Sequence, residues 1–209
     1  EYDINNQAET VYKFIREKIR VDFILVGHSY GGAVSLILQL LLLEYNSDIR
    51  IKKMILLDSP AFMQEIPFFI KYLRTPIIRN LIFIWPTYYQ AKYILENLYY
   101  DKEKITKSKI YRYSFFLKDK SIRYSLIKSA HQIIPKNYKD IIKKYDSFNT
   151  EILIIWGRYD KALTIKIAKK LNIILKNSSL VIIDKCGHIP HEEKPKETYN
   201  IMIDFLNGV

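Results

Sequence analysis

A serine at position 29 stands in the pattern G-H-S-Y-G, which occupies residues 27–31. Apolar residues 23–26 precede the pattern, and an almost continuous apolar run follows it at residues 33–43. Between a buried strand and a helix, G-x-S-x-G predicts a sharp turn that exposes the serine hydroxyl. The positive end of the helix would stabilise the oxygen that becomes negative when Ser29 attacks a carbonyl group. Five residues can match this pattern by chance. The apolar flanks supply the strand and the helix that the turn requires, so the pattern favours acyl chemistry at Ser29.

A carboxylate and an imidazole follow two further apolar runs. Asp160 comes after residues 151–156 within the sequence W-G-R-Y-D, and His188 comes after residues 179–184 within C-G-H. Loops at the carboxyl ends of parallel strands converge, so residues far apart in the sequence meet there. We therefore expect Ser29, Asp160 and His188 to lie close together in space.

The elements that position these residues alternate between strand and helix. Residues 6–20 have helical spacing, residues 53–58 form a further buried run, and helices are expected at residues 164–176 and 195–206. Strands that alternate with helices are typical of an α/β fold with a doubly wound parallel sheet. We count about four parallel strands, and none precedes the run at residues 23–26.

Between residues 62 and 150 the composition shifts to Tyr, Phe, Lys and Ile, and the periodicity becomes helical. Prolines at positions 67, 76, 86 and 135 divide this stretch into several helices. We therefore expect a core of residues 1–61 and 151–209, with residues 62–150 inserted as a helical cap, or lid. The aromatic side chains of the cap serve either for core packing or as the wall of a ligand site.

The net charge of +11 is concentrated in the cap, where residues 62–150 hold 17 Lys and Arg against 7 Asp and Glu. A solvated basic face explains this charge most simply, and attraction to anionic lipid is the next alternative. No zinc-finger spacing, RNP-like motif or glycine-rich phosphate loop supports a nucleic-acid partner. The single cysteine, Cys186, excludes an intrachain disulfide. We expect a cytoplasmic protein without a membrane-spanning helix, associated with a membrane through the cap if at all.

The three motifs together resemble the elbow, acid loop and histidine loop of the α/β-hydrolase family, in its cap-bearing branch of esterases and C–C hydrolases. The resemblance covers nearly the whole chain. It implies that Ser29 is the nucleophile, His188 the general base and then acid, and Asp160 the carboxylate that orients the imidazole. It also implies that the backbone N–H of Tyr30 is one oxyanion donor, with His28 beside it at the elbow as a binding residue. No cofactor and no metal are implied.

Several assignments have rivals in the sequence. Asp58 ends the run at residues 53–58, where some family members place the acid, but the W-G-R-Y-D context favours Asp160. His191 could replace His188 as base, although a glycine and histidine directly after a strand favour His188. His131 in the cap and the buried-type Cys186 have structural roles as their simplest interpretation.

This chain departs from the family pattern in two places. Residues 161–163 (K-A-L) stand where the family often has a proline, which leaves the shape of the acid loop open. Only about twenty residues precede the elbow strand, so the loop that supplies a second oxyanion donor in the family is missing. We therefore expect a fragment of a longer chain, in which residues 23–26 form an exposed edge strand.

Three functions are compatible with these residues. The first is hydrolysis of a small apolar carboxylic ester through an acyl-enzyme at Ser29. The second is hydrolysis of a C–C bond in a diketone-like substrate by the same residues, and the third is binding or membrane association by a catalytically weak protein. The cap is expected to form an apolar acyl pocket, with Phe69 in the run at residues 66–73 and Trp85 in the run at residues 81–85.

Overall fold

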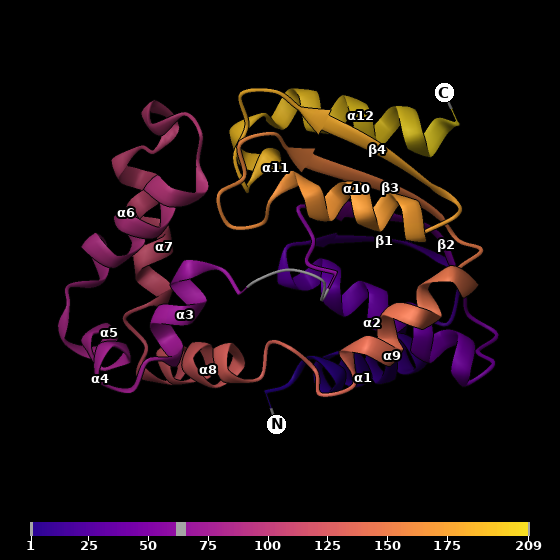
Figure 1. Ribbon diagram of the computed structural model, residues 1–209, viewed down its shortest axis with the longest axis horizontal. Helices are drawn as coiled ribbons and strands as arrows, with labels where there is room; N and C mark the ends of the chain where they lie inside the picture. Colours follow the sequence, from indigo (N-terminus) through magenta and orange to yellow (C-terminus); the bar gives the residue numbers. More distant parts are fainter. Residues whose placement is uncertain (1, 62–65, 209) are drawn as a thin grey trace.

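The computed structural model describes residues 2–61 and 66–208, and one parallel sheet forms the centre of the protein (Figure 1). Its strands are β1 (Phe23–His28), β2 (Ile51–Leu57), β3 (Glu151–Gly157) and β4 (Ser178–Ile183). They lie in the order β1-β2-β3-β4, and all three neighbouring pairs run parallel. The prediction of about four parallel strands is confirmed for the described residues.

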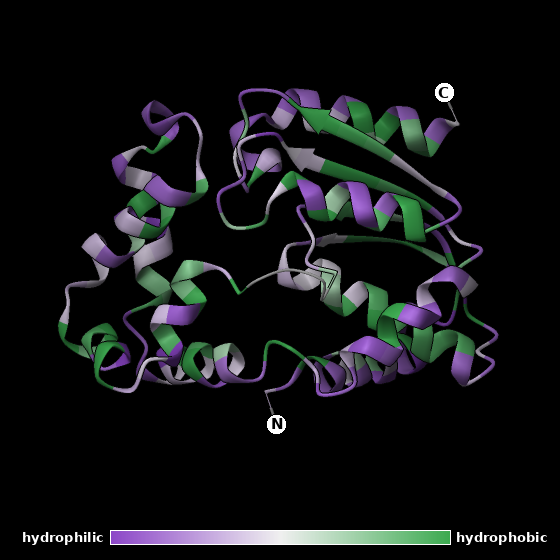
Figure 2. Cartoon of the chain, viewed as in Figure 1, coloured by the Kyte–Doolittle hydropathy of each residue, from purple (hydrophilic) through white to green (hydrophobic). Residues whose placement is uncertain are grey.

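Helices cover both faces of this sheet. Met54 packs into the core formed with α2 (Tyr30–Glu44) and α10 (Ile165–Ile174), whereas its neighbour Ile55 packs on the side of α12 (Pro195–Asn207). Figure 1 shows α12 above the sheet and α2 below it, and Figure 2 shows that α2 is hydrophobic over most of its length. Successive residues of a strand point to opposite faces, so the apolar strands support the doubly wound arrangement expected from the sequence.

β1 lies at the edge of the sheet and pairs with β2 in the described part of the chain. Phe23 and Leu25 pack against the main core, but Ile24 and Val26 are 47% and 46% exposed. α1 (Ile4–Phe14) packs against α2 instead of covering these two side chains. The expectation that this strand lacks a partner on one side therefore holds for the described residues.

The first helix differs from its prediction, which was one helix over residues 6–20. α1 begins after Asp3, whose side chain accepts hydrogen bonds from the backbone N–H groups of Asn5 and Asn6. A wider π-helical turn (Ile15–Ile19) follows, and Arg20 then ends it in the left-handed region at φ 55°.

All described elements between β2 and β3 are helical, as predicted. They are α3 (Phe68–Arg74), α4 (Pro76–Arg79), α5 (Leu81–Ile84), α6 (Thr87–Leu98), η2 (Lys102–Lys104), α7 (Lys107–Phe116), α8 (Lys120–His131), α9 (Tyr138–Lys143) and η3 (Lys144–Ser147). Figure 1 shows α3 to α8 beside the sheet and α9 next to α2. Among the described residues, no helix is long and apolar enough to cross a membrane.

The end of this helical segment packs differently from the rest. Ile141, Tyr145 and Phe148 belong to the main core with α2, whereas Leu95 of α6 and Ile110 of α7 form a small core of their own. The cap boundary at residue 150 stays a prediction, but these contacts place α9 and η3 against the sheet domain.

Candidate active site

Ser29 stands at the junction of β1 and α2 with backbone angles φ 48° and ψ −122°. A positive φ is unusual for a serine and costs on the order of 1–3 kcal/mol, so the surrounding structure must enforce it. Neighbouring backbone is very close here, because a Cβ atom at Gly27 would lie 2.6 Å from the Cα atom of Gly32. A Cβ atom at Gly32 would in turn lie 2.5 Å from the Cβ atom of Ser59. The sharp strand-to-helix turn predicted from the sequence is present.

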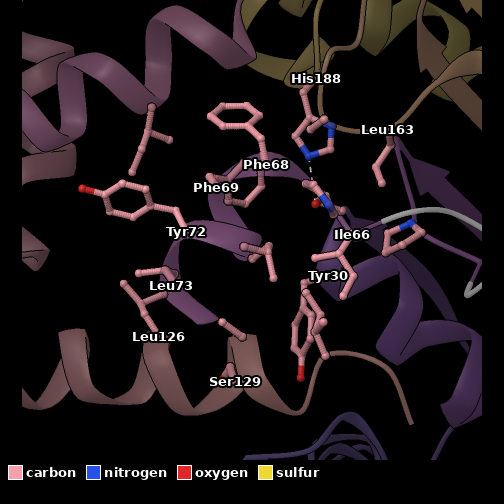
Figure 3. Close-up of a pocket in the computed structure, with 18 of the residues that line it drawn as sticks. Tyr30, Ile66, Phe68, Phe69, Tyr72, Leu73, Leu126, Ser129, Leu163 and His188 are labelled. Atoms are coloured by element: carbon pink, nitrogen blue, oxygen red, sulfur yellow. Dashed lines mark hydrogen bonds between the residues drawn. The ribbon is translucent and has the colours of Figure 1, made fainter. Parts of the chain in front are cut away.

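His188 joins Ser29 and Asp160 in a line of two hydrogen bonds. Its Nδ1 lies 2.7 Å from Asp160 Oδ2, and its Nε2 lies 2.9 Å from Ser29 Oγ. When Nδ1–H donates to the carboxylate, Nε2 carries a lone pair that accepts the serine hydroxyl proton. The side chains of His188 and Asp160 are 4% and 0% exposed, so their electrostatic attraction is little weakened by water. Figure 3 shows His188 pointing into the cavity, and a dashed line marks the hydrogen bond between Ser29 Oγ and His188 Nε2.

The loop that carries Asp160 is fixed without a proline. The second carboxylate oxygen, Oδ1, accepts the backbone N–H groups of Ala162 at 2.7 Å and Leu163 at 2.9 Å. The indole N–H of the buried Trp156 donates to the carbonyl of Leu163 at 3.1 Å. These three bonds close a turn after β3 and fix the loop that carries Asp160.

Asp58 lies at the same edge of the sheet but is not bonded to His188. Its side chain is fully buried, and Oδ1 accepts the backbone N–H of Gly157 at 3.0 Å. Oδ2 has no hydrogen-bond partner among the described residues. Burial, and next the negative charge of Asp160, raise the pKa of Asp58 well above its usual value. Burial and the neighbouring carboxyl group therefore favour the protonated form of Asp58.

Asp58, Asp160 and His188 bring potential metal-ligand atoms within 4.8 Å of one another. Both ring nitrogens of His188 are already engaged, one by Asp160 and the other by Ser29. A cation here would have to break this line of hydrogen bonds, so the cluster suits proton transfer better than metal binding.

The loop that carries His188 is held by Glu193, which the sequence analysis did not single out. Glu193 is fully buried, and its carboxylate accepts the backbone N–H groups of Gly187 at 2.7 Å, Asp101 at 2.7 Å and Tyr100 at 3.2 Å. The backbone N–H of His188 donates to the carbonyl of Leu98 at 2.7 Å. Three of these hydrogen bonds join the histidine loop to the end of α6 and the residues after it, and the bond between Gly187 and Glu193 closes the loop itself.

Glu192 adds a second junction between this loop and the helical insertion. Its carboxylate accepts the hydroxyls of Tyr99 at 2.6 Å and Tyr113 at 2.7 Å, and lies 3.3 Å from Lys109 Nζ. Burial alone would raise the pKa of Glu192, but the two hydroxyls and the Lys109 charge hold it below its usual value. Two adjacent acids in α11 (Pro190–Glu193) were the only sequence signal for these contacts.

The other histidines support the site or lie away from it. His28 Nε2 donates to the carbonyl oxygen of His188 at 2.8 Å, and the ring is not part of the cavity wall. Burial, and next the charge of His188, lower the pKa of His28 to about 4, so it stays neutral at pH 7. The ring of His191 packs against that of His28 at 4.6 Å, and the exposed His131 lies 3.3 Å from Arg79.

Tyr30 is the first residue of α2, directly after Ser29. Its backbone N–H donates to no group among the described residues, as expected for the first turn of a helix. The positive end of the α2 dipole therefore lies directly beside Ser29. The Tyr30 hydroxyl lies deeper in the molecule, also without a described partner, and burial raises its pKa to about 12.

Ser29 and His188 open into a cavity of about 720 Å³ between the sheet domain and the helical insertion (Figure 3). Apolar side chains form most of its wall, and no charged residue lines it among the described residues. From the insertion, residues of α3, α5, α6 and α8 contribute, including Phe68, Phe69, Tyr72, Leu73, Ile82, Trp85, Ile94 and Leu126. Small-molecule sites are commonly cavities of this size and character.

The two runs expected to form the cavity wall contribute unequally. Residues 66–70, 72 and 73 all line the cavity, including Phe69. From residues 81–85, Ile82 and Trp85 line the cavity, whereas Leu81, Phe83 and Ile84 do not. The short helix α5 turns these three side chains outward, because a helix cannot direct consecutive residues to one side.

A family profile described as alpha/beta hydrolase fold matches residues 1–195. The chain belongs to the α/β-hydrolase family. Among curated relatives, the uncharacterized hydrolase YugF of Bacillus subtilis (strain 168) is 28% identical over 207 residues, which cover 98% of this chain and 72% of YugF. A 2-hydroxy-6-oxo-6-phenylhexa-2,4-dienoate hydrolase of Comamonas testosteroni is 26% identical over 192 residues, covering 87% of this chain and 62% of that enzyme.

Solved structures agree with this family assignment. The esterase EaEST from Exiguobacterium antarcticum aligns with a TM-score of 0.78 and 17% identity, over 99% of this chain and 74% of the esterase. A likeness at this identity concerns the fold, and α/β-hydrolases carry out different reactions on one fold. The chemistry of this α/β-hydrolase must therefore be inferred from its own cavity.

Proposed function

We propose that this α/β-hydrolase cleaves a carboxylic ester with an apolar acyl or alcohol group, through an acyl-enzyme at Ser29. The observation that carries the proposal is the line Ser29–His188–Asp160, which opens into an apolar cavity of about 720 Å³. In this proposal the three residues are a catalytic triad, and the helical insertion is the lid that forms most of the acyl site.

In the first half of the reaction, Ser29 Oγ attacks the ester carbonyl carbon while its proton passes to His188 Nε2. Asp160 stabilises the imidazolium that results, and the Tyr30 N–H stabilises the negative carbonyl oxygen. When the tetrahedral intermediate collapses, the C–O bond to the alcohol breaks and His188 returns its proton to the leaving oxygen. The alcohol departs, and the acyl group stays on Ser29.

In the second half, water replaces the alcohol. His188 Nε2 takes a proton from water as the water oxygen attacks the acyl carbon, and the same N–H stabilises the oxyanion. Collapse releases the carboxylic acid, and the proton on His188 returns to Ser29 Oγ. The protein ends the cycle unchanged, and no cofactor enters any step.

C–C hydrolysis is the second candidate, because the Comamonas testosteroni relative acts on a dienoate. Such a substrate carries a carboxylate, which in a buried site requires a cation or several donors. The described wall of this cavity holds no Lys or Arg. An uncharged ester leaves no buried anion unpaired, so the composition of the cavity favours the ester.

A third candidate is a binding protein that has lost its activity. The strained Ser29 backbone argues against this role, because strain of this kind without a catalytic use would be a cost to stability. The buried pair of His188 and Asp160 argues against it for the same reason.

A fluorophosphonate probe tests the proposal directly. It should label the protein at Ser29, and Ser29→Ala should abolish the labelling, whereas Ser35→Ala, in the helix behind the elbow, should leave it intact. Absence of labelling in a well-folded protein would support the binding role. Turnover of a 2-hydroxy-6-oxo-dienoate, followed by its loss of absorbance, that exceeds turnover of p-nitrophenyl butyrate would instead support C–C hydrolysis.

A further inference from the structure

The far end of the helical insertion carries apolar side chains that face away from the cavity. We call this surface the outer tip, and its members are Ile77, Leu81, Phe83, Ile84, Phe115 and Phe116. Ile77, Ile84 and Phe115 are 83%, 78% and 67% exposed. None of the six residues lines the cavity, so their exposure is to the outside of the molecule. Large apolar side chains gathered in this way usually mark an interaction site.

The buried Arg123 of α8 holds the two parts of the outer tip together. Its guanidinium donates to the carbonyl of Ile82 at 3.0 Å and to the carbonyl of Lys118 at 3.3 Å, and its Cζ lies 5.2 Å from the centre of the Phe83 ring. α5 and the turn between α7 and α8 are therefore adjacent. Figures 1 and 2 show α4 and α5 at the end of the insertion farthest from the sheet, with α5 strongly hydrophobic.

The segments that carry these apolar side chains are rich in basic residues. Residues 66–85 hold three Lys and Arg and no acidic residue, and residues 111–128 hold five Lys and Arg, of which Arg123 is buried, with Asp119 as their one acid. The Asp119 carboxylate is engaged at the start of α8, where it accepts the backbone N–H of Ser121 at 2.7 Å. The outer tip therefore combines exposed apolar groups with chain segments of net positive charge.

The same segments reach the cavity from their other side. Ile82 lies next to Leu81 and Phe83, and Leu117 follows Phe116, yet Ile82 and Leu117 line the cavity that contains Ser29. An external surface in contact with the outer tip would therefore be separated from the cavity only by α5 and the end of α7.

We propose that the outer tip docks on a membrane surface that contains anionic phospholipid. Apolar side chains beside Lys and Arg suit the boundary between acyl chains and headgroups, where long basic side chains reach the phosphates. Positive residues near an anionic leaflet add attraction to this insertion. A second copy of the chain fits the surface less well, because it would bring two positive surfaces together. The docking does not depend on which bond the site at Ser29 cleaves.

Sedimentation with unilamellar vesicles tests this proposal. We expect binding to phosphatidylcholine vesicles that contain phosphatidylglycerol, little binding to phosphatidylcholine alone, and weaker binding as salt rises. The double substitution Ile77→Ser and Ile84→Ser should lower the partition coefficient by about tenfold or more. Ile173→Ser on α10 is the matched control, because Ile173 is 77% exposed and lies on the sheet domain. It should leave binding unchanged.

Charge reversal by Lys118→Glu and Lys120→Glu provides an independent variant if the first one folds poorly, and it should also lower binding by about tenfold. Fluorophosphonate labelling shows separately whether each variant keeps its site at Ser29. Equal binding to both kinds of vesicle, or binding that neither variant weakens, would overturn the proposal. A dimer in light scattering that Ile77→Ser and Ile84→Ser dissociate, without vesicle binding by the original chain, would assign the surface to a second copy instead.

Discussion

Asp58 and Asp160 follow neighbouring strands, and a carboxyl oxygen of each lies within 4.8 Å of the other and of a ring nitrogen of His188, but Asp160 alone of the two bonds the ring. Two buried carboxylates at close range cannot both be ionised without a large cost. Asp160 accepts hydrogen bonds from His188, Ala162 and Leu163, whereas Asp58 accepts one from Gly157. More hydrogen-bond donors therefore face Asp160 than Asp58, whose pKa is raised by burial and by the Asp160 carboxyl group.

The first prediction concerns the identity of the acid. Asp160→Asn should lower kcat for p-nitrophenyl butyrate on the order of a thousandfold, because an amide cannot stabilise the imidazolium. Asp58→Asn keeps a carbonyl oxygen for the Gly157 N–H and imitates the neutral acid, so kcat should stay within about tenfold. The reverse ranking, with both variants folded, would make Asp58 the catalytic acid.

The second prediction concerns pH and stability. In the unfolded chain Asp58 ionises near pH 4, but its pKa is raised in the folded protein, so the folded state binds more protons above that pH. Stability therefore falls as pH rises from about 4 toward the folded pKa, by about 1.4 kcal/mol per pH unit for this group. Asp58→Asn removes this loss.

Melting temperatures of the original chain and of Asp58→Asn, measured from pH 4 to pH 8, check this sign. We expect the difference to move in favour of Asp58→Asn as pH rises. A constant difference would mean that Asp58 is ionised in the folded protein as it is in the unfolded chain. Asp184→Asn serves as control, because Asp184 is exposed and paired with Arg158 at the surface.

The third prediction concerns Glu193. Glu193→Ala leaves the buried backbone N–H of Gly187 and the part-buried N–H groups of Tyr100 and Asp101 without their acceptor, and it should lower the free energy of unfolding by about 3 kcal/mol. The histidine loop would loosen, so kcat should fall further than KM rises. Glu197→Ala, four residues on in α12 and exposed, should change neither quantity measurably. Denaturant unfolding and steady-state kinetics of the two variants decide the point.

The fourth prediction concerns the acyl site. On p-nitrophenyl esters of rising chain length, kcat/KM should increase beyond acetate, because each added methylene is buried in the apolar cavity. Phe69→Ala or Trp85→Ala should lower kcat/KM for the longer esters by about tenfold to a hundredfold. The kcat/KM for the acetate ester should change little. If the original chain and both variants prefer the acetate ester, Phe69 and Trp85 serve for packing and do not form the acyl site. Tyr199→Ala, exposed on α12, is the control.

The sequence by itself determined the parts of this protein that depend on local pattern. Continuous apolar runs predicted the strands, and G-H-S-Y-G, W-G-R-Y-D and C-G-H predicted which residues stand at their carboxyl ends. These features can be predicted because strand burial and turn geometry are written into adjacent residues. The helical nature of residues 66–150 followed from periodicity for the same reason.

Only the tertiary structure decided which side chains touch. It selected Asp160 over Asp58 as the partner of His188, gave Glu193 its three backbone donors, and divided residues 81–85 between the cavity and the outer tip. Each of these outcomes depends on hydrogen bonds or packing between segments that lie tens of residues apart. Sequence spacing places a residue at the end of a strand, but the direction of its side chain is set by the neighbours that fill the space around it.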